Sequence, residues 1–166
     1  LKLWAYQKTG LQWLVRATGV LELLPARLRA MESMAPPIRL SDAFSSMPEI
    51  VPAVTPKRRR VAMLLGCVQR VFFSNVNRAT ARVLAAEGCE VVIPQGQGCC
   101  GALMFHTGLE NEAIAMARQF IDAFETELST VDTIVINAAG CGSTLKEYGY
   151  LLRNDPDYAT RAKALA

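Results

Sequence analysis

Four of the five cysteines lie in three short segments that also contain glycine. The segments are 66–67 (GC), 96–101 (GQGCCG) and 140–142 (GCG), and their cysteines are Cys67, Cys99, Cys100 and Cys141. Adjacent cysteines form strained disulfides, so packing or cross-linking does not explain the central pair. Thiolates are soft ligands suited to zinc and to iron–sulfur clusters, and four of them complete the ligand set of either group. We therefore expect these four residues to hold one metal or iron–sulfur centre.

Each cysteine segment follows a short apolar run that is typical of a buried strand. The runs are 60–66 (RVAMLLG), 90–94 (EVVIP) and 133–137 (TIVIN). Segments with apolar residues at helical spacing follow at 74–88, 109–128 and 144–152. Strands that alternate with helices predict a mainly parallel sheet with helical crossovers. The expected fold is a three-layer α/β domain.

The strands predict where the thiols meet. The carboxyl ends of parallel strands lie at one edge of the sheet, which is where open α/β sheets bind ligands. Four thiols from three segments are thus expected to converge there. Cys89 precedes the second strand and belongs to the opposite edge, so we interpret it as a small buried apolar residue outside the site.

Glycines are expected to bring the backbone close to the bound group. Gly98, Gly101 and Gly142 flank the cysteines, and their N–H groups could bond to sulfide. The spacing G-x-G-x-x-G at 96–101 also fits a dinucleotide-binding loop, because it follows a strand and precedes a helix. The acidic residue that such a site needs is absent, since the next strand ends in Asn137, and we prefer the metal centre.

Two polar residues near the cysteines have less specific roles. His106 is the only histidine, and without an evident acid–base partner we expect it to pack or hydrogen-bond near the site. Thr144 and Glu147 have the spacing of a capping box, which predicts that a helix begins at Thr144.

The first third of the chain is expected to lie outside the α/β domain. Apolar residues at helical spacing predict two helices in 1–34, which form a helical connector, and the proline-rich segment 35–59 predicts an extended linker. The domain then covers 60–166. The basic run 57–60 is interpreted as a solvated part of the linker, and no nucleic-acid partner is expected.

The composition indicates a globular protein of a reducing compartment. It is 51% hydrophobic and 20% charged, and its apolar runs are far shorter than the roughly 20 residues of a membrane span. An odd number of cysteines without an export signal argues against a disulfide framework. We therefore expect a cytoplasmic location.

The cysteines and the residues that flank them resemble those of a known family, the cysteine-rich CCG domains. These occur in heterodisulfide reductase, in lactate-utilisation proteins and in the iron–sulfur subunit of glycolate oxidase. The segments 66–69 (GCVQ), 98–103 (GCCGAL) and 137–142 (NAAGCG) look most like the first cysteine-rich domain of the glycolate oxidase subunit, and 1–59 looks like its upstream connector.

The chain also departs from the family pattern. The complete motif ends in C-x-x-C, whereas Thr144 stands three positions after Cys141. We therefore expect a four-thiolate cluster, most simply of the 4Fe-4S type, or zinc, rather than a five-cysteine noncubane cluster. A ferredoxin motif and a second CCG motif are not found in the sequence, so we interpret it as a fragment that ends within its cysteine-rich domain.

The resemblance implies a non-catalytic electron-transfer subunit of an oxidoreductase. It would relay electrons from flavin-containing subunits of a glycolate oxidase to a quinone or another acceptor. The complex could attach to the cytoplasmic face of a membrane through its partners. Two alternatives stay open: a lactate-utilisation or heterodisulfide-reductase-like redox subunit, and a zinc-stabilised interaction module without redox activity.

Overall fold

The computed structural model describes residues 2–37 and 46–165, and its centre is a sheet of four strands. The strands are β1 (Ile50–Val51), β2 (Arg59–Leu64), β3 (Cys89–Val92) and β4 (Thr133–Ile136), in the spatial order β1-β3-β2-β4. The central strand β2 is parallel to both β3 and β4. The predicted mainly parallel sheet is thus confirmed.

The strand β1 was not expected, because its residues lie within the proline-rich segment. It pairs antiparallel with β3, with Ile50 opposite Val92. The N–H of Ile93 also donates to the carbonyl of Glu49 at 2.7 Å. An extended, proline-rich stretch can add to an edge because only one side of an edge strand needs its hydrogen-bonding groups.

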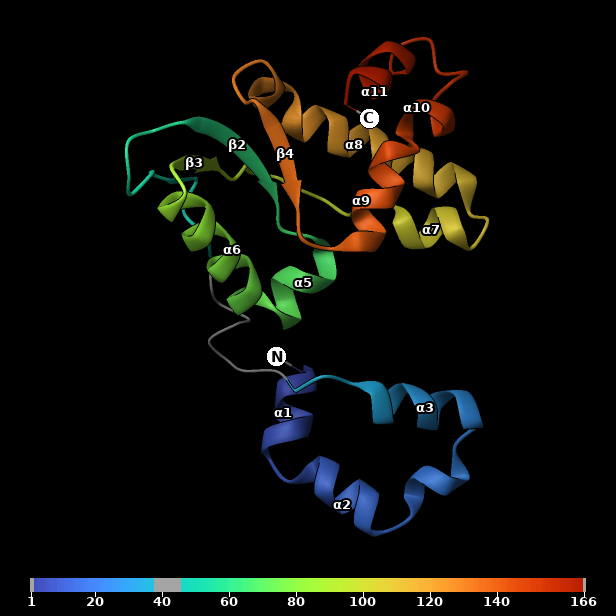
Figure 1. Cartoon of the computed structure of the whole chain (residues 1–166). Coiled ribbons are helices and arrows are strands. Elements are labelled where there is room, and N and C mark those ends of the chain that lie inside the picture. The colour runs from blue at the N-terminus through green and yellow to red at the C-terminus, as the bar shows by residue number, and fades with distance from the viewer. Residues whose placement is uncertain (1, 38–45, 166) are drawn as a thin grey trace.

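Helices cover both faces of the sheet, as Figure 1 shows. On one side lie α5 (Cys67–Phe72) and α6 (Ser74–Ala86). On the other side lie α7 (Ala102–His106), α8 (Glu110–Leu128), α9 (Ala139–Lys146), α10 (Tyr148–Leu151) and α11 (Ala159–Leu165). This arrangement confirms the expected three layers.

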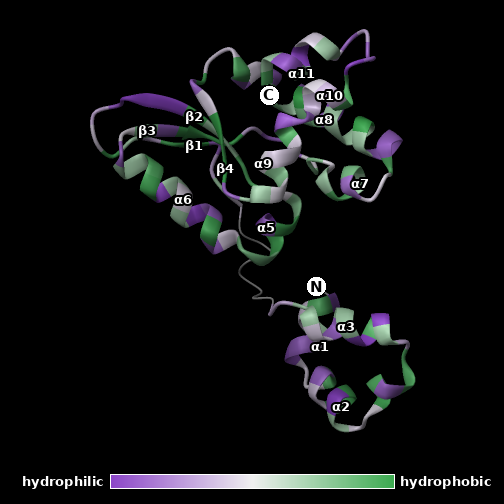
Figure 2. Ribbon diagram, turned by 45° about the vertical axis from the view of Figure 1, so that its right-hand side comes forward, coloured by the Kyte–Doolittle hydropathy of each residue, from purple (hydrophilic) through white to green (hydrophobic). Residues whose placement is uncertain are grey.

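The alternation of side chains along β2 divides the core into two parts. Val61 and Met63 belong to the cluster on the α6 side, whereas Ala62 and Leu64 belong to the cluster on the α8 side. Both faces of β2 are therefore buried from Val61 to Leu64, which explains why this part of the strand is apolar without interruption, whereas Arg59 and Arg60 at its start are not buried. Figure 2 shows the apolar part of the sheet, in green, between the two helical layers.

The last predicted helix is wrong in its bounds. The expected single helix 144–152 is divided into α9 and α10, and α9 begins at Ala139. Cys141 therefore lies in the first turn of a helix instead of a loop. Thr144 lies inside α9, so it cannot form the expected capping box. The residue before α9 is Ala138, which is extended and is where the chain turns from strand to helix.

The connector also contains more elements than the two predicted helices. It consists of α1 (Lys2–Lys8), α2 (Leu11–Ala17), the 3-10 helix η1 (Val20–Leu23) and α3 (Ala26–Met34). Gly10 and Gly19, with φ of 84° and 70°, end the helical geometry in two places. None of these elements contains a buried residue.

Polar contacts join the connector helices to one another. The carboxylate of Glu32 on α3 accepts hydrogen bonds from Tyr6, Gln12 and Arg16. These bonds hold the pKa of Glu32 below its usual value, although partial burial opposes the shift. Within the described residues, no helix combines the length and the apolar character required to cross a membrane.

Candidate metal centre

The structure brings Cys67 and Cys99 together at the carboxyl edge of the sheet. Cys67 is the first residue of α5, directly after β2, and Cys99 lies in the loop between β3 and α7. Their Sγ atoms are 3.4 Å apart, and the Cys67 thiol donates to that of Cys99. Burial raises the pKa of Cys67, and the contact with Cys99 raises it further.

Cys100 and Cys141 form a second thiol pair. Cys100 is only 4% exposed, and its thiol hydrogen-bonds to that of Cys141 in the first turn of α9. This bond, assisted by burial, raises the pKa of Cys100, and the same bond lowers the pKa of Cys141. Within this pair, Cys141 is therefore the thiol that loses its proton more readily, and Cys100 is the one that keeps it.

The four predicted ligands therefore stand at one edge as two pairs. The pairs also interact electrostatically, since charge on Cys67 and Cys99 acts on Cys141. In the described part of the chain, no three His, Cys, Asp or Glu side chains stand in an arrangement that would itself hold a metal ion. That the two pairs form one ligand set stays a prediction.

The donor chemistry of the edge fits a metal–sulfur group. All four residues are free cysteines, and two of them have thiol pKa values raised by burial and by neighbouring thiols. Four thiolates so close together repel one another, and a bound cationic centre removes this repulsion. The helices α5, α7 and α9 also begin at or just beside the cysteines, so their positive amino ends lie at the same edge.

Among the predicted glycines, only Gly101 is required by its backbone. Its φ is 77°, and an added Cβ would lie 3.2 Å from the carbonyl oxygen of Ala113 on α8. An added Cβ at Gly98 or Gly142 would meet its nearest atom at 3.9 or 3.8 Å, which is ordinary contact. Close packing against α8 explains Gly101, and a role for the three N–H groups toward a bound group stays a prediction.

His106 and Thr144 contact each other beside the thiols. The Nε2 atom of His106, at the end of α7, lies 3.4 Å from the hydroxyl of Thr144 on α9. Thr144 is buried, so the position where the family pattern has a further cysteine is filled by a residue that connects two helices of the site.

Sequence reasoning missed the buried polar residues that hold the edge together. Asn77 on α6 donates from Nδ2 to the carbonyl of Leu65 at 2.9 Å and accepts from Nδ2 of Asn137 at 3.0 Å. Gln97 bonds to the end of β2, and Tyr148 bonds to the backbone of Cys100. The sequence feature that could have revealed them is a polar residue inside an otherwise apolar or glycine-rich segment, as with Gln97 between two glycines.

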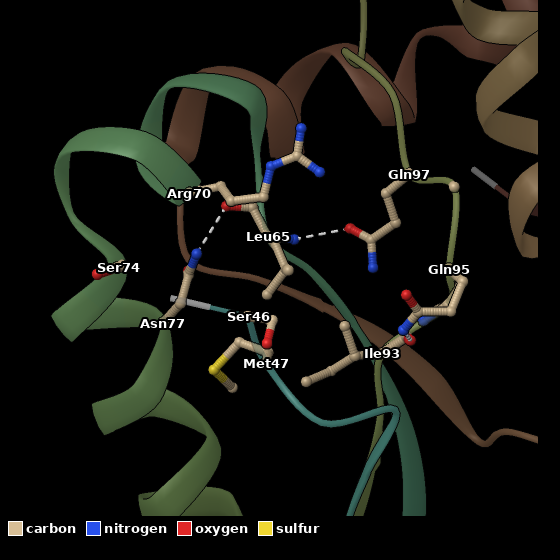
Figure 3. Close-up of a pocket in the computed structure, with 11 residues that line it drawn as sticks. Ser46, Met47, Leu65, Arg70, Ser74, Asn77, Ile93, Gln95 and Gln97 are labelled. Carbon is tan, nitrogen blue, oxygen red and sulfur yellow. Dashed lines mark hydrogen bonds between the residues drawn. The ribbon is translucent and has the colours of Figure 1, made fainter. Parts of the chain in front are cut away.

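A small cavity of about 140 Å³ adjoins these residues (Figure 3). Met47 and Ile93 form its apolar wall, and Asn77 and Gln97 lie on its polar side. Both amides are already bonded to backbone groups of the segment 63–65. The cavity therefore borders the hydrogen bonds that hold the end of β2, and not the cysteines themselves.

Fold and site together define the class: an α/β domain with four cysteines at one edge of a mainly parallel sheet. Residues 61–146 match the family model described as a cysteine-rich (CCG) domain, and the chain belongs to this family. Residues 2–35 match a second model, the linker region of the glycolate oxidase iron–sulfur subunit. These matches confirm the resemblance seen in the sequence.

Three relatives show how far the similarity extends. The chain is 42% identical over 159 residues to the probable glycolate oxidase iron–sulfur subunit of Bacillus subtilis (strain 168), which covers 96% of the chain and 35% of that protein. It is 41% identical over 110 residues to the glycolate oxidase iron–sulfur subunit of Escherichia coli (strain K12), covering 66% and 27%. It is 33% identical over 107 residues to lactate utilization protein A of Geobacillus thermodenitrificans (strain NG80-2), covering 64% and 43%.

The chain thus spans between 27% and 43% of the length of these relatives. No solved structure matches the chain.

Proposed function

We propose that the chain is part of the iron–sulfur, electron-transfer subunit of a glycolate oxidase. The observation that carries this proposal is the presence of the subunit's linker region at 2–35 and the cysteine-rich domain at 61–146 in one chain. The similarity to lactate utilization protein A extends over only 64% of the chain. The Escherichia coli glycolate oxidase subunit covers a similar share, 66%, so coverage alone does not discriminate. The linker match and the higher identity, 42% and 41% against 33%, favour glycolate oxidase over a lactate-utilisation or heterodisulfide-reductase-like subunit.

Within this proposal, Cys67, Cys99, Cys100 and Cys141 hold an iron–sulfur cluster of the 4Fe-4S type. Such a cluster supplies one-electron transfer when bound. The two thiol pairs support this ligand set because they already lie at one edge of the sheet. The N–H groups of 98, 101 and 142 and the amino ends of α5, α7 and α9 would offset negative charge there.

The chain itself would transfer electrons without contacting glycolate. Its partners would be flavin-containing subunits of the same oxidase, and the electrons would pass to a quinone or another acceptor. Free cysteines are typical of a reducing compartment, which supports the cytoplasm, with the complex attached to the cytoplasmic face of the membrane through its partners.

Metal content tests the cofactor. Protein purified without oxygen should be coloured, with broad absorption near ~400 nm and equal amounts of iron and acid-labile sulfide. Colourless protein that contains zinc would contradict electron transfer and would favour an interaction module without redox activity.

The electron donor is tested in the complete oxidase. Glycolate added to the anaerobic complex should bleach the cluster absorption, because electrons then reach this subunit. Lactate is the matched control, since it differs from glycolate by one methyl group. Bleaching by lactate alone would assign the chain to lactate utilisation.

A further inference from the structure

The buried side chain of Gln97 links two of the cysteine segments. It is 7% exposed and lies two positions before Cys99. Its Oε1 accepts a hydrogen bond from the N–H of Leu65 at 2.9 Å, and its Nε2 donates to the carbonyl of Met63 at 3.0 Å. Figure 3 shows this amide facing the end of β2.

The two bonds continue the sheet beyond the point where β3 leaves it. The pairing of β2 with β3 ends at Ala62 and Val92. In a parallel sheet, the carbonyl of one residue and the N–H of the residue two positions later face the same neighbour. The amide of Gln97 thus satisfies Met63 and Leu65, two backbone groups that a longer β3 would have bonded.

This arrangement couples Cys67 to Cys99. Leu65 lies two residues before Cys67, and Gln97 lies two residues before Cys99. A bidentate amide between Leu65 and Gln97 therefore restrains the two segments close to their cysteines. The outcome is the 3.4 Å separation between the Sγ atoms of this pair.

The side chain of Tyr148 links the other two cysteine segments. Its hydroxyl donates to the carbonyl of Cys100 itself at 2.7 Å, and its ring is completely buried, edge-on against Phe120. Tyr148 begins α10, which directly follows α9 and its Cys141. The hydrogen bond therefore joins the backbone at Cys100 to the start of α10, which a single residue separates from the end of the helix that carries Cys141.

We propose that Gln97 and Tyr148 are positioning residues of the metal centre, each holding one thiol pair at its present separation. Gln97 sets the pair Cys67 and Cys99, and Tyr148 sets the pair Cys100 and Cys141. Groups that orient metal ligands in this way commonly change metal affinity when they are removed. The role toward the metal rests on the proposed function, whereas the role toward the thiols can be measured without metal.

Two substitutions remove the hydrogen bonds and keep the size of the side chains. Gln97→Met lacks both bonds to β2, and Tyr148→Phe lacks the bond to Cys100. Their matched controls are Gln95→Met and Tyr150→Phe. Gln95 is exposed and its amide donates to the carbonyl of Ile93 two residues away, and Tyr150 is 59% exposed.

Disulfide formation in the metal-free full chain reports the two thiol separations. Diamide removes two electrons and two protons from a thiol pair, which leaves one disulfide and reduced diamide, and peptide mass spectrometry identifies the pair. Gln97→Met should slow formation of the disulfide between Cys67 and Cys99 several-fold and leave the other pair unchanged. Tyr148→Phe should do the reverse, and both controls should match the wild type.

Metal retention provides the second readout. Transfer of iron to a chelator should become about 10- to 100-fold faster in Gln97→Met and in Tyr148→Phe, and the midpoint potential should shift, whereas the controls should not change. If Gln97→Met does not fold, as judged by circular dichroism, Gln97→Glu keeps the acceptor for Leu65 and should show a smaller effect in the same direction.

The outcomes separate this inference from the proposed function. If the variants only lower the unfolding temperature, with unchanged disulfide rates and iron retention, the two residues are merely structural and the inference is wrong. Equal slowing of both disulfides in each variant would also overturn it. If the wild type binds no iron but the disulfide rates change selectively, the positioning of the thiols holds and the proposed function fails.

Discussion

At the scale of single residues, Cys141 and Cys89 differ in their position relative to the sheet. Cys141 lies in the first turn of α9 beside Cys100, whereas Cys89 begins β3 and packs, partly buried, against the cluster on the α6 side. They occupy opposite edges of the same sheet. A ligand role is therefore expected of Cys141 and not of Cys89.

Replacement of each cysteine by alanine tests this assignment. Cys141→Ala should lose most of the bound iron, because it removes one of the four proposed ligands, and Cys89→Ala should retain nearly all of it. Iron and sulfide are measured after anaerobic purification of both variants. Equal losses of iron would show that the edge of the sheet does not distinguish the cysteines.

At the scale of the elements, a buried carboxylate anchors the last helix. Asp155 precedes α11, and its carboxylate accepts from Nε of Arg118 on α8 at 2.7 Å and from the N–H groups of Asp157 and Tyr158. Burial by itself raises the pKa of Asp155, but these hydrogen bonds outweigh it and hold the pKa below the usual 3.8.

This shift predicts how stability depends on pH. A carboxyl group with a lowered pKa in the folded state stabilises the protein fully above its unfolded pKa, and it loses that contribution as the pH falls. The free energy of unfolding should therefore fall as the pH decreases through 3.8 toward the lower folded value. Urea unfolding at several pH values gives the free energy of unfolding of the wild type and of Asp155→Asn. If this free energy falls equally steeply with pH in both proteins below pH 3.8, the prediction is wrong.

At the scale of the whole molecule, we propose three parts: a helical connector at 1–34, a linker at 35–59 and a cysteine-rich domain at 60–166. The connector elements bury no residue. The linker differs, because Met47 and Val51 pack against the cluster on the α6 side and β1 pairs with β3. The end of the linker therefore contributes to the domain.

Two truncations separate these contributions. Removal of residues 1–45 should leave the unfolding temperature of the α/β domain unchanged. Removal of 1–52 should instead lower the free energy of unfolding of the domain by about 1 to 3 kcal/mol, because it takes away β1 and two partly buried apolar side chains. Thermal unfolding followed by circular dichroism compares the two, and a large loss in the shorter truncation would refute the division.

The sequence by itself determined the class of the fold and the edge that the thiols share. Strand and helix periodicities are local, so the apolar runs before Cys67, before Cys99 and before Cys141 were sufficient to predict a parallel sheet. The order of strands and helices then placed four cysteines together and Cys89 apart from them. The spacing and flanks of the cysteines were also sufficient for the resemblance to the CCG family.

Only the tertiary structure decided how these residues meet. The division into two thiol pairs, the bond from Gln97 to β2 and the bond from Tyr148 to Cys100 each join segments more than thirty positions apart. The partner of a buried polar side chain depends on which strands become neighbours, and local pattern does not encode this. The same reason hid β1, whose pairing with β3 could not be read from a proline-rich segment.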